Sequence, residues 1–258
     1  MNDLFIGGGG YSGVLFIGAL EYIHENKLLE LKNFYGCSIG SLIGCLYISG
    51  YTPKNILSKF LEVEMSEIVK YDFNNLTSEN HLIDETLLDT LIGFLWENLP
   101  EGITLEDFSS KFSVNVNIYS TNVTKNEYTC LNNADYPKIK LKDALKASMS
   151  IPFLFKPVII NNDTFVDGCC KNLYGSPPLD IYICGYSIIL NSISVSKSYL
   201  TNLMLSMIDR VKPRSTFTIE CNNKLDPNIY LNLDKLGKKT IIEMYKNGIY
   251  FAKNTLKD

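Results

Sequence analysis

The stretch NFYGCSIGSLIGCLYIS, residues 33–49, decides the fold of this chain. Asn33 to Cys37 has the composition of a short strand, and Ser38 to Ser49 has that of an apolar helix built partly from small residues. The same order occurs earlier, where the strand-like Asp3 to Gly7 precedes a helical pattern over Val14 to Lys27. A repeated strand–turn–helix unit predicts an α/β fold.

The turn inside this stretch carries a G-x-S-x-G motif, with Ser38 between Gly36 and Gly40. A serine at a sharp strand-to-helix turn adopts a strained backbone, and small residues two before and two after let neighbouring backbone pass. The turn also presents the hydroxyl at a helix N-terminus, which favours developing negative charge. Ser38 is therefore a candidate nucleophile. The alternative is a helix-capping serine with glycine packing.

A glycine run, Gly7 to Gly10, follows the first expected strand, and Gly13 closes the loop. Consecutive glycines cost conformational entropy and persist where backbone N–H groups converge on negative charge. The nucleotide-binding interpretations fit poorly, because no acidic residue ends the second strand and no Lys-Ser/Thr follows the loop. An oxyanion hole explains both glycine-rich sites together. A phosphate site and a simple tight turn remain alternatives.

A serine nucleophile needs a base, and the usual histidine of α/β-hydrolases comes late in the chain. The two histidines, His24 and His81, lie in the first third, where we expect surface or capping positions. A catalytic Ser38 must then use another group. Asp167 follows the strand-like Thr164 to Val166 and precedes Gly168, and a partly desolvated carboxylate can serve as a base. The alternative is an Asp-Gly turn without chemistry.

Composition narrows the function classes. The 258 residues carry 24 Lys+Arg against 28 Asp+Glu, a net charge of -4, which argues against a nucleic-acid partner. With 46% apolar and 20% charged residues, we expect one globular domain over residues 1–258. The seven cysteines lack zinc-site or disulfide spacing, which indicates free, mostly buried thiols. No signal peptide or membrane span is evident, so we expect an intracellular, cytoplasmic protein that could contact membranes peripherally.

The rest of the chain continues the α/β pattern. Residues 54–112 are mostly helical, with a cap at Thr52-Pro53 and a capping-box pattern from Thr104 to Asp107. A hairpin is expected around the turn Asn161 to Asp163. Further strands are expected over 113–120, 127–132, 158–160, 164–166, 181–186 and 216–221, and further helices over 142–149, 197–211 and 234–257.

The three motifs, in this order, resemble the patatin-like phospholipase family. GCSIGSLIGCLYISGYTPKNI resembles the family's serine elbow and following helix, and DALKASMSIPFLFKPVIINNDTFVDGCCKN resembles its segment leading into the aspartate. The resemblance implies a three-layer α/β/α fold with a mostly parallel central sheet. It also implies a Ser-Asp dyad without histidine.

On this resemblance, Ser38 is the nucleophile, Asp167 is the base, and the oxyanion hole is lined by Gly8, Gly9 and Gly10. No metal or organic cofactor is implied, and the partner is a lipid substrate at a membrane or micelle surface. The chain departs from the family twice. Ser12 stands where Arg or Lys is usual, which removes a positive charge that bears on headgroup preference and on full activity. Cys169 stands where the family has Gly or Ala.

Three functions are compatible with these motifs. The first is a serine carboxylic-ester hydrolase that cleaves lipids through Ser38 and an acyl-enzyme. The second is an acyltransferase that uses the same site with an alcohol or lysolipid acceptor. The third is a catalytically silent lipid-binding protein of the same fold, for which Ser12 and Cys169 are the only support.

Overall fold

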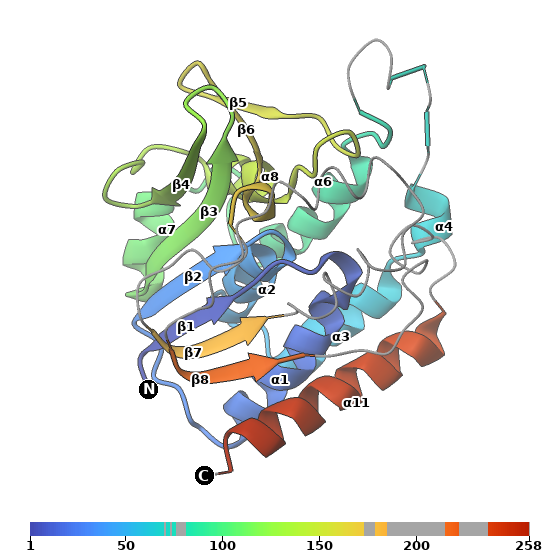
Figure 1. Cartoon of the computed structure of the whole chain (residues 1–258), viewed down its shortest axis with the longest axis vertical. Coiled ribbons are helices and arrows are strands. Elements are labelled where there is room, and N and C mark those ends of the chain that lie inside the picture. Colours follow the sequence, from blue (N-terminus) through green and yellow to red (C-terminus); the bar gives the residue numbers. More distant parts are fainter. Residues whose placement is uncertain are drawn as a thin grey trace.

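A computed structural model describes residues 1–69, 71–72, 74–75, 81–172, 179–184, 215–221 and 237–257 (Figure 1). The N-terminal part contains the two expected strand–helix units. The first consists of β1 (Asp3–Ile6) and α1 (Gly13–Glu25), joined through the short 3-10 helix η1 (Gly10–Ser12). The second consists of β2 (Asn33–Cys37) and α2 (Ile39–Ile48). Both units match the sequence prediction closely.

The strands form one sheet in the order β5-β6-β3-β2-β1-β7-β8, with β4 also paired to β3. The run from β3 to β8 is parallel, whereas β4, β6 and β5 join it as antiparallel strands. This is the mixed α/β fold with a mostly parallel central sheet that the sequence predicted. The remaining strands are β3 (Asn115–Asn122), β4 (Glu127–Asn132), β5 (Val158–Ile160), β6 (Asp163–Asp167), β7 (Leu179–Cys184) and β8 (Ser215–Glu220).

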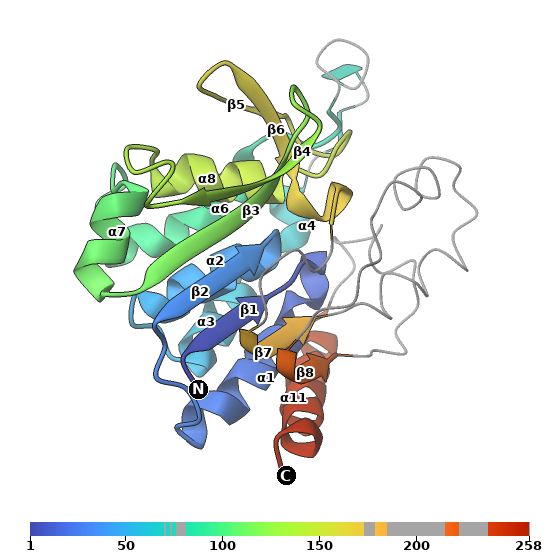
Figure 2. The ribbon, with the colours of Figure 1, turned by 60° about the vertical axis from the view of Figure 1, so that its left-hand side comes forward.

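The expected hairpin between β5 and β6 has a shorter turn than predicted. Only Asn161 and Asn162 form it, both with positive φ (50° and 66°), and Asp163 already belongs to β6. Two-residue hairpin turns favour such backbone geometry, and asparagine tolerates it better than most residues. Figure 2 shows this hairpin and the β3–β4 end extending beyond the ends of β1 and β2.

The remaining helices begin largely where capping chemistry predicted. The Thr52 side chain accepts a hydrogen bond from the Asn55 N–H, and that of Thr104 accepts one from the Asp107 N–H. The helices are α3 (Pro53–Glu62), α4 (Met65–Ile68), α6 (Thr86–Gly93), α7 (Leu105–Phe112), α8 (Leu141–Met149) and α11 (Lys238–Thr255), with the 3-10 helices η2 (Phe94–Glu97) and η3 (Gly168–Cys170). None of these described helices is both long enough and apolar enough to cross a membrane.

The two faces of the sheet differ. One face packs against the helices through alternating buried residues such as Leu4 and Ile6 of β1. The opposite face carries a smaller cluster of mostly aromatic side chains and thiols from the strands and η3: Phe5, Tyr35, Cys37, Tyr119, Tyr128, Cys130, Cys169, Leu179 and Tyr182. The expected helix over 197–211 lies outside the described residues.

The C-terminal helix α11 packs lengthwise on α1 (Figure 1). It begins at Lys238 after the capping position Gly237, slightly later than predicted. Two glycines allow the contact. A Cβ on Gly18 would lie 2.0 Å from the Tyr245 carbonyl oxygen, and a Cβ on Gly248 would lie 2.0 Å from that of Leu15. The two helix backbones therefore touch, and α11 braces the helix that follows the glycine loop.

Candidate active site

The turn between β2 and α2 has the geometry expected of a nucleophile elbow. Ser38 has φ 52° and ψ −134°, a strained conformation for a residue with a side chain. A Cβ on Gly40 would lie 2.2 Å from the Ile6 carbonyl oxygen, and one on Gly36 would lie 2.5 Å from the Ser41 Cα. Both glycines of the motif are therefore required by close backbone, as the sequence predicted.

Hydrogen bonds hold the elbow from two sides. The Ser38 N–H donates to Ser148 Oγ (2.9 Å), and that hydroxyl donates to the Tyr119 carbonyl oxygen (2.6 Å). On the helix side, the N–H and the hydroxyl of Ser41 both donate to the Ser38 carbonyl oxygen. Ser148 is fully buried and lies on α8, so a separate helix fixes the backbone of the turn. Ser148 could not be predicted from the sequence, because nothing in the local pattern marks it.

The register of the sheet brings Asp167 to this turn. Cys37, the last residue of β2, lies opposite Tyr119 of β3. The next residue along β3, Ser120, pairs with Asp167, because β6 runs antiparallel to β3 and ends there. The residue after β2 and the last residue of β6 therefore sit at the same level of the sheet. The chain brings Ser38 and Asp167 together from 129 positions apart.

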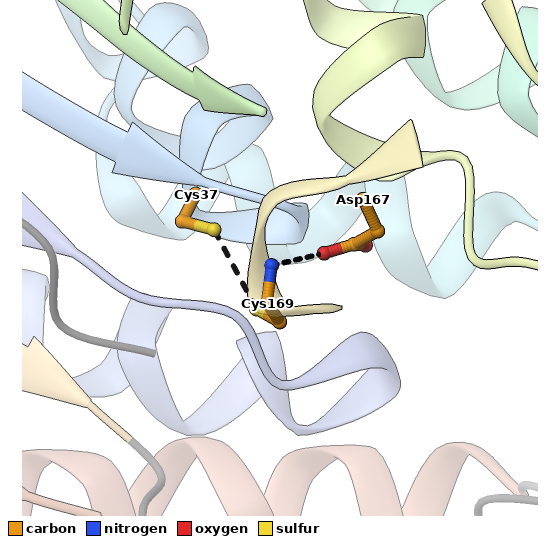
Figure 3. Close-up of side chains that lie close together, drawn as sticks. All are labelled: Cys37, Asp167 and Cys169. Atoms are coloured by element: carbon orange, nitrogen blue, oxygen red, sulfur yellow. Dashed lines mark hydrogen bonds between the residues drawn. The ribbon is translucent and has the colours of Figure 1, made fainter. Parts of the chain in front are cut away.

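The two side chains make direct contact. Ser38 Oγ donates to Asp167 Oδ2 at 2.6 Å, and both residues are almost completely buried. The other carboxylate oxygen, Oδ1, accepts from the Cys169 N–H at 2.9 Å (Figure 3). The backbone of Asp167 is held as well, since its N–H donates to the Ser150 carbonyl oxygen. The carboxylate is thus aimed at the serine hydroxyl from a rigid position.

Burial raises the pKa of the Asp167 carboxyl to about 6, and hydrogen bonds from the Ser38 hydroxyl and the Cys169 N–H offset part of that rise. Within the described ranges, no cationic side chain forms an ion pair with Asp167. A carboxylate with a pKa near neutrality is a much stronger base than an exposed aspartate. The burial that raises the pKa therefore suits Asp167 to accept a proton.

The glycine loop passes beside the serine. A Cβ on Gly8 would lie 3.2 Å from the Ser38 Cβ and 2.1 Å from Cys169 Sγ, so only glycine fits there. Gly10 has φ +53°, which favours glycine, and it starts the turn into α1. Three further predicted glycines also lie where a side chain would not fit. A Cβ on Gly9 would meet the Phe16 ring, one on Gly13 would meet the Ile39 side chain, and one on Gly168 would meet the Tyr119 carbonyl oxygen.

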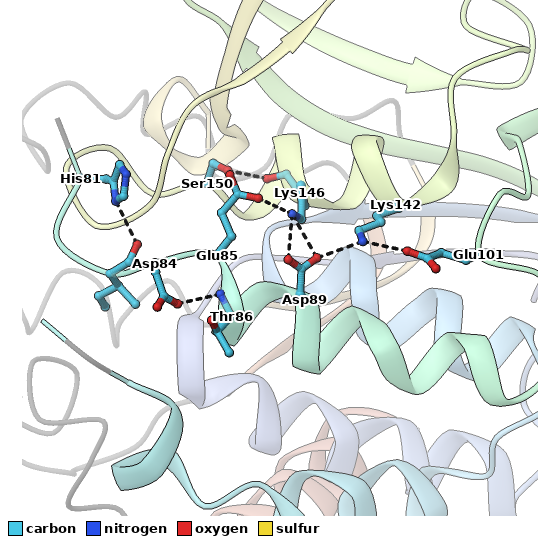
Figure 4. A network of polar contacts seen from close by, with 10 residues as sticks. His81, Asp84, Glu85, Thr86, Asp89, Glu101, Lys142, Lys146 and Ser150 are labelled. Atoms are coloured by element: carbon cyan, nitrogen blue, oxygen red, sulfur yellow. Dashed lines mark hydrogen bonds and ion pairs between the residues drawn. The ribbon is translucent and has the colours of Figure 1, made fainter. Parts of the chain in front are cut away.

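The histidines lie elsewhere, and the prediction that both are surface or capping residues was wrong for one of them. His24 is exposed on α1 and contacts the Tyr47 hydroxyl. His81 is buried, with 5% of its surface exposed, and its Nδ1 contacts the Ile83 carbonyl oxygen (Figure 4). It is buried because its segment docks on the loop after α8, where the Leu82 N–H donates to the Phe153 carbonyl oxygen. Neither histidine is a hydrogen-bond partner of Ser38 or Asp167 in the described structure.

An ion-pair network supports the helix that carries Ser148. Lys146 of α8 pairs with Glu85 and Asp89 of the α6 region, and Lys142 pairs with Asp89 and Glu101 (Figure 4). Ser120 Oγ ties the same helix to the sheet by donating to the Ala147 and Val166 carbonyl oxygens. Helix α8 is therefore anchored by ion pairs to the α6 region and by hydrogen bonds to the sheet.

One group of side chains at the site could ligate a metal ion. The sulfurs of Cys37 and Cys169 and a carboxylate oxygen of Asp167 all lie within 4.8 Å of one another. It is the only such group of histidine, cysteine and acidic side chains in the described part of the chain. All the described cysteines are free thiols, including the adjacent Cys169 and Cys170.

Comparisons with known proteins agree with this geometry. The family model described as patatin-like phospholipase matches residues 4–180, which include the glycine loop, the elbow and Asp167. Probable lipid hydrolase 463L of Invertebrate iridescent virus 6 is 27% identical over 195 residues, covering 70% of this chain and 63% of that protein. Uncharacterized protein R571 of Acanthamoeba polyphaga mimivirus is 24% identical over 174 residues, covering 65% of this chain and 58% of that protein.

Two solved structures share the fold. VipD from Legionella pneumophila gives a TM-score of 0.55 at 13% identity, covering 98% of this chain and 66% of that one. The type III effector ExoU gives a TM-score of 0.52 at 13% identity, covering 99% of this chain and 52% of that one. This chain thus spans less than two thirds of the length of these relatives and solved structures. With the family model matching most of its length, the chain belongs to the patatin-like phospholipase family.

Proposed function

We propose that this protein is a serine acyl hydrolase that cleaves carboxylic ester bonds of phospholipids or related lipids through a Ser38–Asp167 dyad. The observation that carries the proposal is the 2.6 Å hydrogen bond from Ser38 Oγ to Asp167 Oδ2, made without an intervening imidazole. Family membership and the name of the viral relative, probable lipid hydrolase, support a lipid ester as the substrate.

The first half-reaction forms the acyl-enzyme. Asp167 accepts the Ser38 proton while Ser38 Oγ attacks the ester carbonyl, giving a tetrahedral oxyanion. Collapse of this intermediate expels the alcohol, and Asp167 returns the proton to the leaving oxygen. In the second half-reaction Asp167 takes a proton from water, whose oxygen attacks the acyl-enzyme. Collapse then releases the carboxylic acid, and the proton passes back to Ser38.

The oxyanion needs backbone N–H donors near Ser38. The Ser38 N–H already donates to Ser148 Oγ. The N–H groups of Gly8, Gly9 and Gly10 lie in the loop that runs beside the serine, and we assign oxyanion stabilisation to this loop. One such donor is typically worth about 3 kcal/mol of barrier.

The test is labelling with a fluorophosphonate probe, followed by peptide mapping and a lipid hydrolysis panel. We expect the label on the Ser38 peptide, and neither label nor hydrolysis in Ser38→Ala. Ser58→Ala is the matched control, because Ser58 is a helix-surface serine whose hydroxyl bonds only to the Lys54 carbonyl oxygen in the described structure. Label that persists in Ser38→Ala would refute the assignment.

Product analysis then separates transfer from hydrolysis. The panel is repeated with a lysolipid acceptor, and we expect free fatty acid to remain the main product. Acylated acceptor as the main product would instead identify an acyltransferase with the same dyad. Complete absence of Ser38-dependent turnover in a labelled, folded protein would leave a lipid-binding role.

A further inference from the structure

Cys169 brings a thiol into a place where hydrolysis does not require one. A Cβ on Gly8 would lie only 2.1 Å from the Cys169 sulfur, so this sulfur packs directly on the glycine loop. It also lies 3.5 Å from Cys37 Sγ, and its backbone N–H holds Asp167 Oδ1 (Figure 3). The thiol thus stands between the loop, the elbow and the base.

The distances within this group suit a metal ion. The sulfurs of Cys37 and Cys169 and an oxygen of Asp167 lie within 4.8 Å of one another. Two sulfurs bound to one tetrahedral zinc at about 2.3 Å each are about 3.8 Å apart. The observed 3.5 Å between the two sulfurs is therefore close to the edge of such a tetrahedron. Small shifts of the sulfurs and of the carboxylate oxygen, which breaks its hydrogen bond to Ser38 or to the Cys169 N–H, would complete a three-ligand set.

We propose that Cys37, Cys169 and Asp167 form a binding site for a thiophilic divalent cation, Zn²⁺ or its analogue Cd²⁺, and that an ion bound there blocks hydrolysis. The binding site stands on the side-chain geometry alone, whereas the inhibition rests on the proposed function. Thiolates and carboxylates are both ligands of such ions, and water would fill the fourth position.

The charge balance permits this exchange in a buried site. The two thiols release their protons to solvent as both sulfurs bind the ion, and the Asp167 carboxylate supplies the third ligand. Two protons are exchanged for one divalent cation, so the net charge of the group stays at one negative. Binding therefore does not add an uncompensated charge to the buried site, which would be costly.

An ion at this position is an inhibitor rather than a catalyst. The metal takes a lone pair of the Asp167 carboxylate that hydrolysis needs for the Ser38 proton. Its positive charge also lowers the basicity of the carboxylate. Cys169 is partly exposed, whereas Cys37 and Asp167 are buried, so an ion reaches the group from the Cys169 side.

The binding test uses the full chain, reduced and freed of metal with a chelator, and titrated with Cd²⁺. We expect a thiolate-to-cadmium charge-transfer band in the ultraviolet and one tightly bound ion per chain by equilibrium dialysis. Cys169→Ala and Cys37→Ala should each weaken this site by about 100-fold or more, since loss of even an outer-sphere partner costs 10–100-fold. Cys130→Ala is the control, because Cys130 is a partly exposed thiol outside the group.

The functional test measures ester hydrolysis against Zn²⁺ concentration, with each variant compared to its own metal-free rate. We expect inhibition that a chelator reverses and that needs about 100-fold more Zn²⁺ in Cys169→Ala than in the parent or in Cys130→Ala. Equal inhibition of Cys169→Ala and the parent would overturn the proposal, as would the absence of a tight Cd²⁺ site. Metal binding without any Ser38-dependent turnover would refute the proposed function and leave the metal site standing.

Discussion

At the scale of single residues, the site contains two features that cost stability. Ser38 adopts a positive φ, which costs about 1–3 kcal/mol for a residue with a side chain. Asp167 keeps a carboxylate in surroundings that raise its pKa. Each feature is also what the proposed chemistry would use, because the strained turn aims Oγ at the carboxylate and desolvation makes that carboxylate basic. Activity and stability are therefore expected to oppose each other at these two residues.

The pKa of Asp167 sets the first prediction, the dependence of hydrolysis on pH. The proposed base, Asp167, must be ionised to accept the Ser38 proton, and its pKa is raised to about 6. We expect kcat/KM for a soluble short-chain ester, measured with chelator present, to rise as pH increases through about 6 and to level off above it. An exposed aspartate would instead give a rise near pH 4. A profile that is flat between pH 5 and 7 would contradict the role of Asp167.

The same shift predicts an unusual effect of Asp167→Asn on stability. A folded-state pKa above the unfolded value of about 3.9 means that the contribution of Asp167 to stability is full below pH 4 and is lost as pH rises through about 6. A neutral amide at this position does not ionise and therefore escapes this loss. We expect the variant to lose hydrolysis by about 10³-fold or more. We also expect its free energy of unfolding at pH 8 to rise, by up to about 3 kcal/mol for a pKa difference of about two.

Denaturant unfolding of the parent and of Asp167→Asn at pH 4 and pH 8 checks the predicted gain in stability. The advantage of the variant should be large at pH 8 and small at pH 4, because the parent carboxyl is then mostly protonated. A variant that is destabilised equally at both pH values would show that the hydrogen bonds of Asp167 outweigh its desolvation.

At the scale of elements, the elbow depends on how α8 meets the end of β3. The Ser148 hydroxyl links the Ser38 N–H to the Tyr119 carbonyl oxygen inside a fully buried contact. The ion pairs of Lys142 and Lys146 fix the opposite side of the same helix. We therefore expect α8 to position the proposed nucleophile, Ser38, without contributing a group that reacts.

Ser148→Ala tests this positioning role. The substitution leaves two buried backbone groups without their partner, each at a cost of about 1–3 kcal/mol. We expect lower thermal stability and a reduced kcat with little change in KM, because the turn holding Ser38 loses its support while the substrate contacts remain. The pH profile should keep its midpoint near 6, since Asp167 is unaffected. Ser58→Ala is again the control, and a variant with unchanged kcat would exclude the positioning role.

The sequence predicts the elements and the meeting of Ser38 with Asp167 better than the contacts that hold these two residues in place. Ser38 and Asp167 could be identified because Gly36, Gly40 and Gly168 mark their turns locally. The strand-like segments before them place both residues at strand ends. Ser148 could not be identified, because its role arises only from the packing of α8 against β3. Burial of His81 was missed for the same reason, since it depends on docking against the distant Phe153.

At the scale of the whole molecule, the C-terminal helix α11 packs on α1, the helix that follows the glycine loop. Helix α11 lies beyond the residues matched by the family model, yet it packs backbone to backbone on α1. Helix α1 begins at Gly13, directly after the glycine loop and η1. We therefore expect the placement of the proposed oxyanion donors to depend on a helix more than 200 residues away in sequence. The sequence of neither helix predicts this contact, because nothing around Gly18 or Gly248 marks it as a packing position.

Gly248→Ala tests whether α11 holds the glycine loop in place. In an isolated helix the change would stabilise by about 1 kcal/mol. Here the new Cβ would lie 2.0 Å from the Leu15 carbonyl oxygen, and backbone on both sides leaves no flexible atom to yield, so the helices must separate. We expect a net loss of up to about 3 kcal/mol, the upper range for overpacking, measured by denaturant unfolding. Fluorophosphonate labelling of Ser38 should also slow, because displacement of α1 moves the loop beside the nucleophile. Gly237→Ala is the matched control, since its Cβ would meet nothing within 4 Å at the start of the same helix. If Gly248→Ala loses stability but labels at the parent rate, α11 supports the fold without governing the loop.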